Sequence, residues 1–425
     1  MSPAGDQQTP QERLVEHATC LGCGCACDDI AVHISNERIT DLTNACALGI
    51  RWFGDGTTPG DIRVDGRNAA LDEALSAMAG AIRQARQLLV YLAPDISCEA
   101  QREAIALADC LRGAVDTVSS ATVLDWILAS QERGRAAATL GEIRNRADVI
   151  VFWGVDPSVR YPRYWSRYAP EPTGLHIESG RRSRRVIAVD IGESRGPDDA
   201  DDRVSLDERD EVATLTATAA MVRKPDTSFA EPLGGRAASL ATQLATGRYV
   251  AIVADAEPPV SSVNDPRPHF RDAQRTAALI ALSQALNGPT RCALSILRGG
   301  GNRSGAEAVL TAHTGYPTGV SFSNGHPLYR PHDVVRGTDT VLVVGDAAQI
   351  PAGSLAGFSP GATAIIGPRA SQHAAAAAID TGIAGIHVNG TAVRMDDVPL
   401  RLRPSIHRGL DPAEVVRVLR ERVLR

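Results

Sequence analysis

Residues 20–30 of the chain read CLGCGCACDDI, and one more cysteine, Cys46, follows after a short segment. Two residues separate Cys20 from Cys23, and three separate Cys23 from Cys27. This spacing lets one tight loop direct three thiolates inward while Cys46 closes the site. Four thiolates in such an arrangement commonly hold a cubane iron–sulfur cluster. The sequence therefore predicts a metal site formed by Cys20, Cys23, Cys27 and Cys46.

Two alternatives for these thiols stay open. Zinc is one, because tetrahedral binding by four thiolates also begins from a C-x2-C pair, although zinc ribbons usually have a second pair and Cys46 stands alone. Unligated or disulfide-bonded structural thiols are the other. Gly22 and Gly24 favour the cluster, since they let backbone N–H groups approach sulfur. Cys25 is out of phase with the four predicted ligands and is interpreted as a bystander.

Length and composition narrow the class of protein. A chain of 425 residues should form two or three domains. The net charge of −6 gives no sign of a nucleic-acid-binding surface. Residues 1–11 are polar and contain no apolar core of a signal peptide, and no stretch is long enough to span a membrane. We therefore expect a cytoplasmic protein, where clustered cysteines favour metal over disulfides.

The chain after the cysteines changes its pattern near residue 70. Residues 30–34 and 38–42 alternate like two short strands of a hairpin, so residues 1–70 are predicted to form a small cysteine-rich β module. Beyond it, helical periodicity over 71–85 and 98–111 alternates with apolar runs at 87–92, 148–155 and 185–190. Strands without internal polar residues are covered on both faces, which indicates a parallel sheet.

The second half repeats this order, with apolar runs at 249–255, 338–346 and 363–369. The predicted fold class is therefore α/β, with the cysteine-rich module followed by two Rossmann-like parallel-sheet domains over 71–232 and 233–425. Ligands of such sheets bind beyond the carboxyl ends of the strands. Gly154 and Gly345 lie at strand ends where a phosphate or base could approach the backbone, and Asp190 ends a strand where it could bind a ribose hydroxyl. The alternative is that these residues only form turns.

Several longer motifs occur in one order along the chain. They are Cys20-x2-Cys23-x3-Cys27 with Asn44-Ala45-Cys46, Glu99-Ala100-Gln101, Trp153-Gly154-x-Asp156-Pro157, Thr314-Gly315-Tyr316-Pro317, and Gly390-Thr391-Ala392 with Arg394-Met395-Asp396. In this combination the chain resembles the molybdopterin oxidoreductase family, and within it the B subunit of formylmethanofuran dehydrogenase. The resemblance covers nearly the whole chain. It implies domains like the first three of formate dehydrogenase and dimethyl sulfoxide reductase.

The resemblance also implies cofactors and ligands. It assigns a [4Fe–4S] cluster to Cys20, Cys23, Cys27 and Cys46, and a tungsten or molybdenum bis-pterin guanine dinucleotide between the two α/β domains. The residues implied to bind that second cofactor are Trp153, Gly154, Asp156, Asp190, Gly315, Gly345 and Asp346. In the family, the metal reduces CO2 to formate and an amidohydrolase-like subunit condenses formate with the furan amine.

One departure from the family pattern changes the expected function. The metal needs a soft protein ligand, which the family supplies as a cysteine in a segment like Ser-Thr-Val-Cys-His. In this chain Leu124 occupies the cysteine position, Asp125 replaces the histidine, and Trp126 follows. A leucine cannot ligate a metal. We therefore expect no catalytic residue for the redox step in this chain.

A B subunit without the ligand is similar to that of the formyltransferase/hydrolase complex of methylotrophic bacteria, which acts in tetrahydromethanopterin-linked formaldehyde oxidation. This resemblance implies a redox-inactive scaffold whose partners are an amidohydrolase-like A subunit, a formyltransferase D subunit and a C subunit. The alternative is an active molybdenum- or tungsten-dependent formylmethanofuran dehydrogenase subunit. Leu124 favours the scaffold, whereas the four cysteines favour the dehydrogenase.

Overall fold

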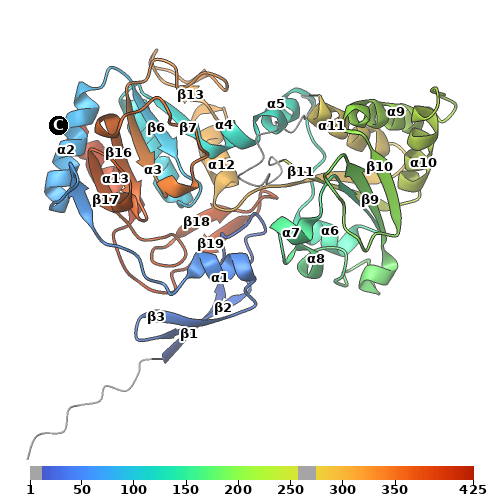
Figure 1. Ribbon diagram of the computed structural model, residues 1–425, viewed down its shortest axis with the longest axis horizontal. Helices are drawn as coiled ribbons and strands as arrows, with labels where there is room; N and C mark the ends of the chain where they lie inside the picture. Colours follow the sequence, from blue (N-terminus) through green and yellow to red (C-terminus); the bar gives the residue numbers. More distant parts are fainter. Residues whose placement is uncertain (1–11, 257–273) are drawn as a thin grey trace, which may run out of the picture. The chain divides into compact units, whose positions relative to one another are not determined.

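The computed structural model describes residues 12–256 and 274–425 (Figure 1). The polar segment 1–11, on which the cytoplasmic prediction drew, lies outside the described residues. Helices and mostly parallel sheets make up the chain, which confirms the predicted α/β class and its parallel sheets. In the described ranges, no helix is both long enough and apolar enough to cross a membrane.

The chain divides into two compact units. The first unit contains residues up to 121 together with 300–394 and 399–425, and the second contains 122–299 and 395–398. The second unit is thus an insertion between two strands of the first. Its short return segment, 395–398, lies in the turn of a hairpin that belongs to the first unit.

The first unit opens with a three-stranded antiparallel sheet in the order β1-β2-β3. Its strands are β1 (Glu12–Ala18), β2 (Ile30–Ser35) and β3 (Arg38–Thr43), and helix α1 (Ala47–Phe53) follows. The predicted hairpin is confirmed, with Asn36 and Glu37 both at positive φ in its turn. The cysteine loop is the connection from β1 to β2.

A nine-stranded sheet forms the body of the first unit, in the order β14-β13-β7-β6-β15-β16-β17-β4-β5. Its five central strands are parallel: β7 (Ala114–Thr117), β6 (Leu88–Leu92), β15 (Thr340–Val344), β16 (Thr363–Gly367) and β17 (Ala377–Asp380). The antiparallel edges are β13 (Val320–Ser321) with β14 (Leu328–Tyr329), and β4 (Ile62–Val64) with β5 (Arg67–Asn68). The central order, 2-1-3-4-5 along the chain, places a switch point between β6 and β15.

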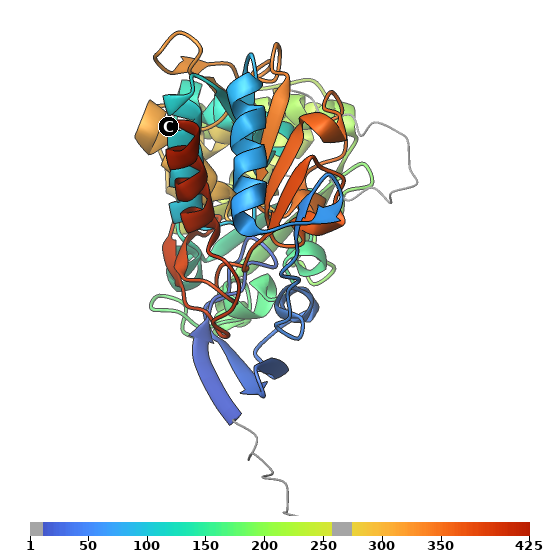
Figure 2. The ribbon, with the colours of Figure 1, turned by 90° about the vertical axis from the view of Figure 1, so that its left-hand side faces the viewer.

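The two faces of this sheet are covered differently. Four helices pack on one face, α2 (Leu71–Gln84), α3 (Cys98–Cys110), α12 (Arg303–Thr314) and α13 (Pro412–Val423). Figure 2 shows α2 and α13 side by side on that face. The opposite face packs against irregular segments that include Val334, Leu355 and Phe358. Helices on both faces were predicted, but here loops supply the second apolar layer.

The second unit contains a five-stranded parallel sheet in the order β10-β9-β8-β11-β12. Its strands are β8 (Val149–Trp153), β9 (Arg185–Ile191), β10 (Asp202–Leu206), β11 (Tyr249–Asp255) and β12 (Arg291–Leu297). Its helices are α5 (Leu124–Arg133), α6 (Leu140–Arg146), α7 (Pro157–Arg160), α8 (Tyr164–Arg167), α9 (Glu211–Arg223), α10 (Leu233–Ala245) and α11 (Arg275–Leu286). The order 3-2-1-4-5 is that of a Rossmann half, with its switch point between β8 and β11.

The strands do not follow one another as the sequence pattern suggested. We expected the runs at 249–255, 338–346 and 363–369 to form one later sheet. Instead β11 pairs with β8, whereas β15 and β16 join β6. Each sheet therefore contains strands from both halves of the chain, because the second unit is inserted after β7.

Smaller elements complete the first and second units. A two-stranded sheet pairs β18 (Gly390–Val393) with β19 (Pro399–Leu402), and α4 (Val118–Thr122) follows β7. Short 3-10 turns lie at Gly180–Ser183, Glu208–Asp210, Ala347–Gln349, Pro360–Ala362 and Ala370–Gln372.

Candidate functional site

The cysteine loop is held closed by its own backbone. The N–H of Cys20 donates to the carbonyl of Cys27 at 2.8 Å, and the N–H of Ala26 donates to that of Cys23 at 3.1 Å. The Gly22 N–H donates to Sγ of Cys20 at 3.3 Å. A side chain at Gly22 would lie 2.8 Å from the carbonyl oxygen of Leu48, so α1 packs closely against the loop. The predicted role of Gly22, an N–H group directed at sulfur, matches this geometry.

The four predicted thiol ligands lie near one another in the first unit. Cys20 and Cys27 are buried, and Cys23 and Cys46 are half-buried. Burial raises the pKa of Cys20 well above its usual range, and the neighbouring thiols of Cys23, Cys27 and Cys46 raise it further, against the lowering effect of the Gly22 N–H. The loop and the start of α1 therefore bring all four sulfurs within electrostatic reach.

The arrangement bears on which metal the thiols would fit. Sulfurs around one zinc ion lie about 3.8 Å apart, as Zn–S bonds of about 2.3 Å in a tetrahedron require. Among the described residues, no three Cys, His, Asp or Glu side chains converge closely enough to hold a single metal ion. In a cubane each sulfur binds a different iron, so the thiols lie further apart. Neighbouring but not converging thiols therefore fit a cluster better than one ion.

Cys25, interpreted as a bystander, is fully buried in the same loop. A hydrogen bond with Cys23 and then burial raise the pKa of Cys25 well above its usual range, while the guanidinium of Arg394 acts in the opposite direction. Cys25 is therefore held as a neutral thiol beside Cys23. Sequence spacing alone gave no sign of that contact.

The cofactor residues predicted in the second unit lie at the end of β8 and β9. Trp153 is fully buried, and its indole N–H donates to Glu211 at 2.7 Å. Gly154 has a φ of +62°, and a side chain there would lie 3.2 Å from Ile191. The carboxylate of Asp156 accepts the N–H of Ser158 and caps α7. These three residues therefore have structural roles of their own.

Asp190, predicted to bind a ribose hydroxyl, is surrounded by donors from the chain itself. Its carboxylate accepts hydrogen bonds from Arg203 at 2.7 Å and 2.9 Å, from Arg195 at 3.2 Å, and from the N–H of Gly196 at 2.8 Å. Burial tends to raise the pKa of Asp190, but these donors outweigh it and hold the pKa below its usual range. Arginine side chains thus occupy the positions around the carboxylate that a ribose would need.

Gly345 and Asp346 lie in the first unit, at the switch point between β6 and β15. Gly345 has a φ of +111°, and a side chain there would lie 2.6 Å from Asp95. The buried Asp346 carboxylate pairs with Arg369, and its N–H donates to Asp95 at 2.7 Å. Burial, together with the Asp346 carboxylate, raises the pKa of Asp95 to about 7. Asp95 was not recognised from the sequence, because Asp346 is its partner only in the fold.

Gly315 is placed away from these strand ends, at the end of α12. It caps that helix with a φ of +85°, and its N–H donates to the carbonyl of Thr311 at 2.8 Å. Left-handed glycine is the usual residue at such a helix end. Its position is therefore explained by the turn alone.

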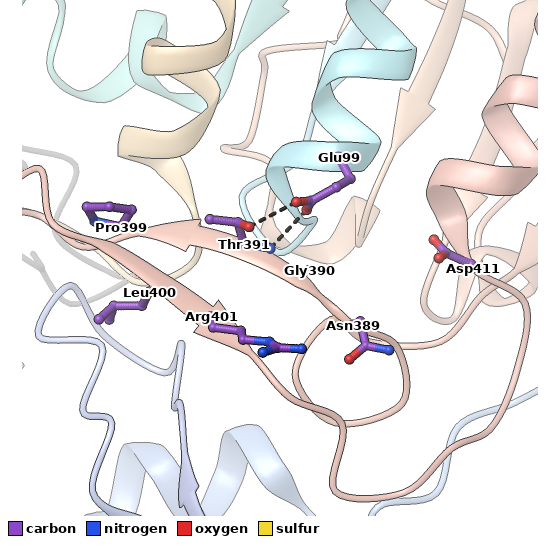
Figure 3. A pocket seen from close by; sticks show the side chains of 8 residues that line it. All are labelled: Glu99, Asn389, Gly390, Thr391, Pro399, Leu400, Arg401 and Asp411. Carbon is purple, nitrogen blue, oxygen red and sulfur yellow. Dashed lines mark hydrogen bonds between the residues drawn. The ribbon is translucent and has the colours of Figure 1, made fainter.

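A hollow of about 560 Å³ opens in the first unit beside β18 and β19 (Figure 3). Its lining residues are Glu99, Asn389, Gly390, Thr391, Pro399, Leu400, Arg401 and Asp411. The carboxylate of Glu99 accepts the N–H and the hydroxyl of Thr391, both at 2.9 Å, which fixes one wall. The sequence motifs at 99–101 and 390–392 thus meet in space.

Comparison with known proteins gives two full-length relatives. The chain is 28% identical over 429 residues to the B subunit of tungsten-containing formylmethanofuran dehydrogenase 2 from Methanocaldococcus jannaschii, covering 95% of both chains. The corresponding Methanococcus maripaludis protein is 27% identical over 451 residues, with 96% of this chain and 99% of the relative covered. The chain is a homologue of the formylmethanofuran dehydrogenase B subunit. No family model matches it.

One solved structure shares the fold of this B-subunit homologue. It is the crystal structure of the formyltransferase/hydrolase complex FhcABCD from Methylorubrum extorquens with methylofuran. The TM-score is 0.68 at 21% identity, and the alignment covers 85% of this chain and 98% of that one. At this identity, the likeness establishes the fold.

The segment in which the resemblance places the metal ligand lies after β7. Leu124 is the first residue of α5 and is half-buried, and Asp125 is exposed. Trp126 is 5% exposed and packs in the core of the second unit with Val123 and Ala129. The hydrocarbon side chain of Leu124 offers no donor atom to a metal.

Proposed function

We propose that this chain is the B subunit of a formyltransferase/hydrolase complex related to formylmethanofuran dehydrogenase, acting in one-carbon metabolism without a redox step of its own. The observation that carries this proposal is Leu124, which begins α5 where the resemblance expects the metal-binding cysteine. Trp126 fills the adjoining core, so the segment is packed as a helix. Full-length similarity to the formylmethanofuran dehydrogenase B subunit supports the assignment.

The residues implied to hold the pterin cofactor give further support. The indole of Trp153 is bound to Glu211, the carboxylate of Asp190 to Arg203, and that of Asp346 to Arg369. A nucleotide that used these groups would have to displace contacts already made within the chain. The residues present therefore do not fit the bis-pterin cofactor, and we derive no chemistry from it.

The cysteine loop has a different place in the proposal. Cys20, Cys23, Cys27 and Cys46 would hold the [4Fe–4S] cluster, with the Gly22 N–H directed at Cys20. When bound, such a cluster stores and passes single electrons. In a chain without the second metal centre, we propose that it stabilises the loop between β1 and β2 and the start of α1.

Partners and location follow from the same proposal. The FhcABCD structure is an assembly of several subunits with methylofuran bound. We propose that this chain assembles in the cytoplasm with three kinds of partner: the amidohydrolase-like, formyltransferase and C subunits. It would serve these partners as a scaffold, and its own contribution to the reaction would be to hold them together.

A retained dehydrogenase function is the second candidate, and the four gathered cysteines favour it. Replacing Leu124 by cysteine separates the two. If the chain is a redox-inactive scaffold, the purified complex carrying Leu124→Cys should still form no formate from CO2 with a low-potential electron donor. Hydrolysis of the formylated furan carrier to formate should stay within about twofold of the wild-type rate. Measurable CO2 reduction by the wild-type complex or by this variant would contradict the scaffold proposal.

A further inference from the structure

A glycine turn from a distant part of the sequence packs directly on the cysteine loop within the first unit. The N–H of Gly301 donates to the carbonyl of Leu21 at 2.8 Å. A side chain at Gly300 would lie 2.8 Å from the carbonyl oxygens of both Leu21 and Gly22. Gly301 has a φ of +87°, and a side chain there would lie 2.2 Å from the Pro94 carbonyl oxygen. Only glycines permit this approach at both positions.

The next residue, Asn302, anchors that turn. Asn302 is fully buried, and its side-chain N–H2 donates to the carbonyl oxygens of Ile96 at 2.9 Å and Thr391 at 3.3 Å, and to Sγ of Cys98 at 3.4 Å. Its side-chain oxygen accepts the N–H of Val393 at 2.7 Å. One amide therefore connects the segment after β6, the start of α3 and strand β18.

Neighbouring contacts hold the partners of Asn302 in place. The side chain of Gln101 donates to the backbone carbonyl of Asn302 at 3.1 Å. Thr391 is fixed in turn by its two hydrogen bonds to Glu99 (Figure 3). A side chain at Gly305 would lie 2.0 Å from the Asn302 oxygen, so a residue without a side chain is needed there too. Several distant segments thus agree on one position for this amide.

From this geometry we infer that Asn302 is a positioning residue for the cysteine loop. It fixes the turn at Gly300 and Gly301, which in turn holds the Leu21 carbonyl between Cys20 and Cys23. The inference rests on the proposed function only in taking those cysteines as metal ligands. It assigns the glycine-rich motif to the first unit's cysteine loop, where a phosphate- or pterin-binding turn was the sequence alternative.

The test compares Asn302→Ala with a matched variant, Asn287→Ala, in the intact complex. Asn287 makes a similar set of bonds in the second unit, to the backbone N–H and carbonyl of Cys292 at 3.1 Å and 2.7 Å and to the carbonyl of Ser283 at 2.8 Å. After reduction and metal removal by a chelator, each cysteine's rate of alkylation by iodoacetamide is read by mass spectrometry. Asn302→Ala should speed alkylation of Cys20 and Cys23 about tenfold and leave Cys292 unchanged. Asn287→Ala should do the reverse.

A second pair of variants keeps the inference testable if Asn302→Ala folds poorly. Gly300→Ala places a methyl group against the Leu21 and Gly22 carbonyls, whereas Gly361→Ala meets no atom within 4 Å. We expect faster alkylation of Cys20 and Cys23 in Gly300→Ala alone. Unchanged rates at Cys20 and Cys23 in both Asn302→Ala and Gly300→Ala would overturn the inference. So would an equal rise at Cys292, because that would reflect loosening of the whole chain.

Metal content separates this inference from the proposed function. The wild-type complex should hold its iron against a chelator about tenfold longer than Asn302→Ala does. Wild-type protein without bound metal would refute the proposed cluster, and the alkylation rates of the same protein would still decide the role of Asn302. Equal retention of iron by both proteins would contradict the positioning role while leaving the cluster in place.

Discussion

Asp95 shows how a single buried carboxyl makes stability depend on pH. Its pKa is raised to about 7 by burial and by the Asp346 carboxylate, against an ordinary value near 3.8. Between pH 4 and pH 7 the folded chain therefore binds a proton at Asp95 that the unfolded chain has released. The free energy of unfolding contributed by this group falls as pH rises through that range, by at most about 1.4 kcal/mol per pH unit.

Asp95→Asn should remove that dependence. An asparagine oxygen can still accept the Asp346 N–H, and the charge is gone. We expect the variant to lose less stability than the wild type between pH 5 and pH 8 in urea unfolding. Asp116, whose pKa burial raises to about 6, should supply part of the remaining slope. Identical slopes in the two proteins would contradict the protonation of Asp95 in the fold.

Asp190 gives a second prediction at this scale. Its carboxylate gathers Arg203, Arg195 and the Gly196 N–H, although the Arg203 side chain is 35% exposed and partly screened by water. Replacing Asp190 by alanine should therefore cost about 1–3 kcal/mol of unfolding free energy, the cost of leaving buried partners without an acceptor. Chemical denaturation measures it. A loss below about 0.5 kcal/mol would mean that Asp190 is available for a ligand.

Elements were predictable wherever the signal was local. Apolar runs located β6, β8, β9 and β11, and helical periodicity located α2 and α3, because their patterns repeat within a few residues. The cysteine loop was equally local. Contacts between distant residues left no pattern to recognise: Asp95 and Asp346 are 251 positions apart, and Asn302 and Cys98 are 204 apart. The hub at Asn302 was therefore missed, although its glycines had been noted.

The join between β8, α9 and α11 offers a test at the scale of elements. Glu211 of α9 accepts the Trp153 indole N–H and the Arg275 guanidinium, both at 2.7 Å, and both charged side chains are buried. Glu211→Gln keeps an acceptor for the indole but leaves the arginine charge unpaired. We expect a loss of about 3 kcal/mol in unfolding free energy.

The double variant Glu211→Gln with Arg275→Met controls for the pair itself. Removing both charges should restore much of the lost stability, because the unpaired charge then disappears. Equal losses in the single and double variants would show that the hydrogen bond to Trp153, rather than the ion pair, joins these elements.

At the scale of the whole molecule, two α/β units carry two different histories of the same ligand chemistry. The cysteine loop keeps four thiols together with an N–H group on sulfur. The strand ends that would bind a nucleotide are filled by arginine side chains and a buried tryptophan. The insertion of the second unit after β7 was not predicted, since neither sheet's strand order is written in local sequence.

Metal analysis of the anaerobically purified complex tests the central claim most directly. Iron, zinc, tungsten and molybdenum would be measured per chain together with the visible absorption spectrum. The account predicts about four iron atoms per chain, as one cubane requires, with neither tungsten nor molybdenum. Tungsten or molybdenum at about one atom per chain would contradict it, because the chain would then hold the metal centre that Leu124 cannot ligate.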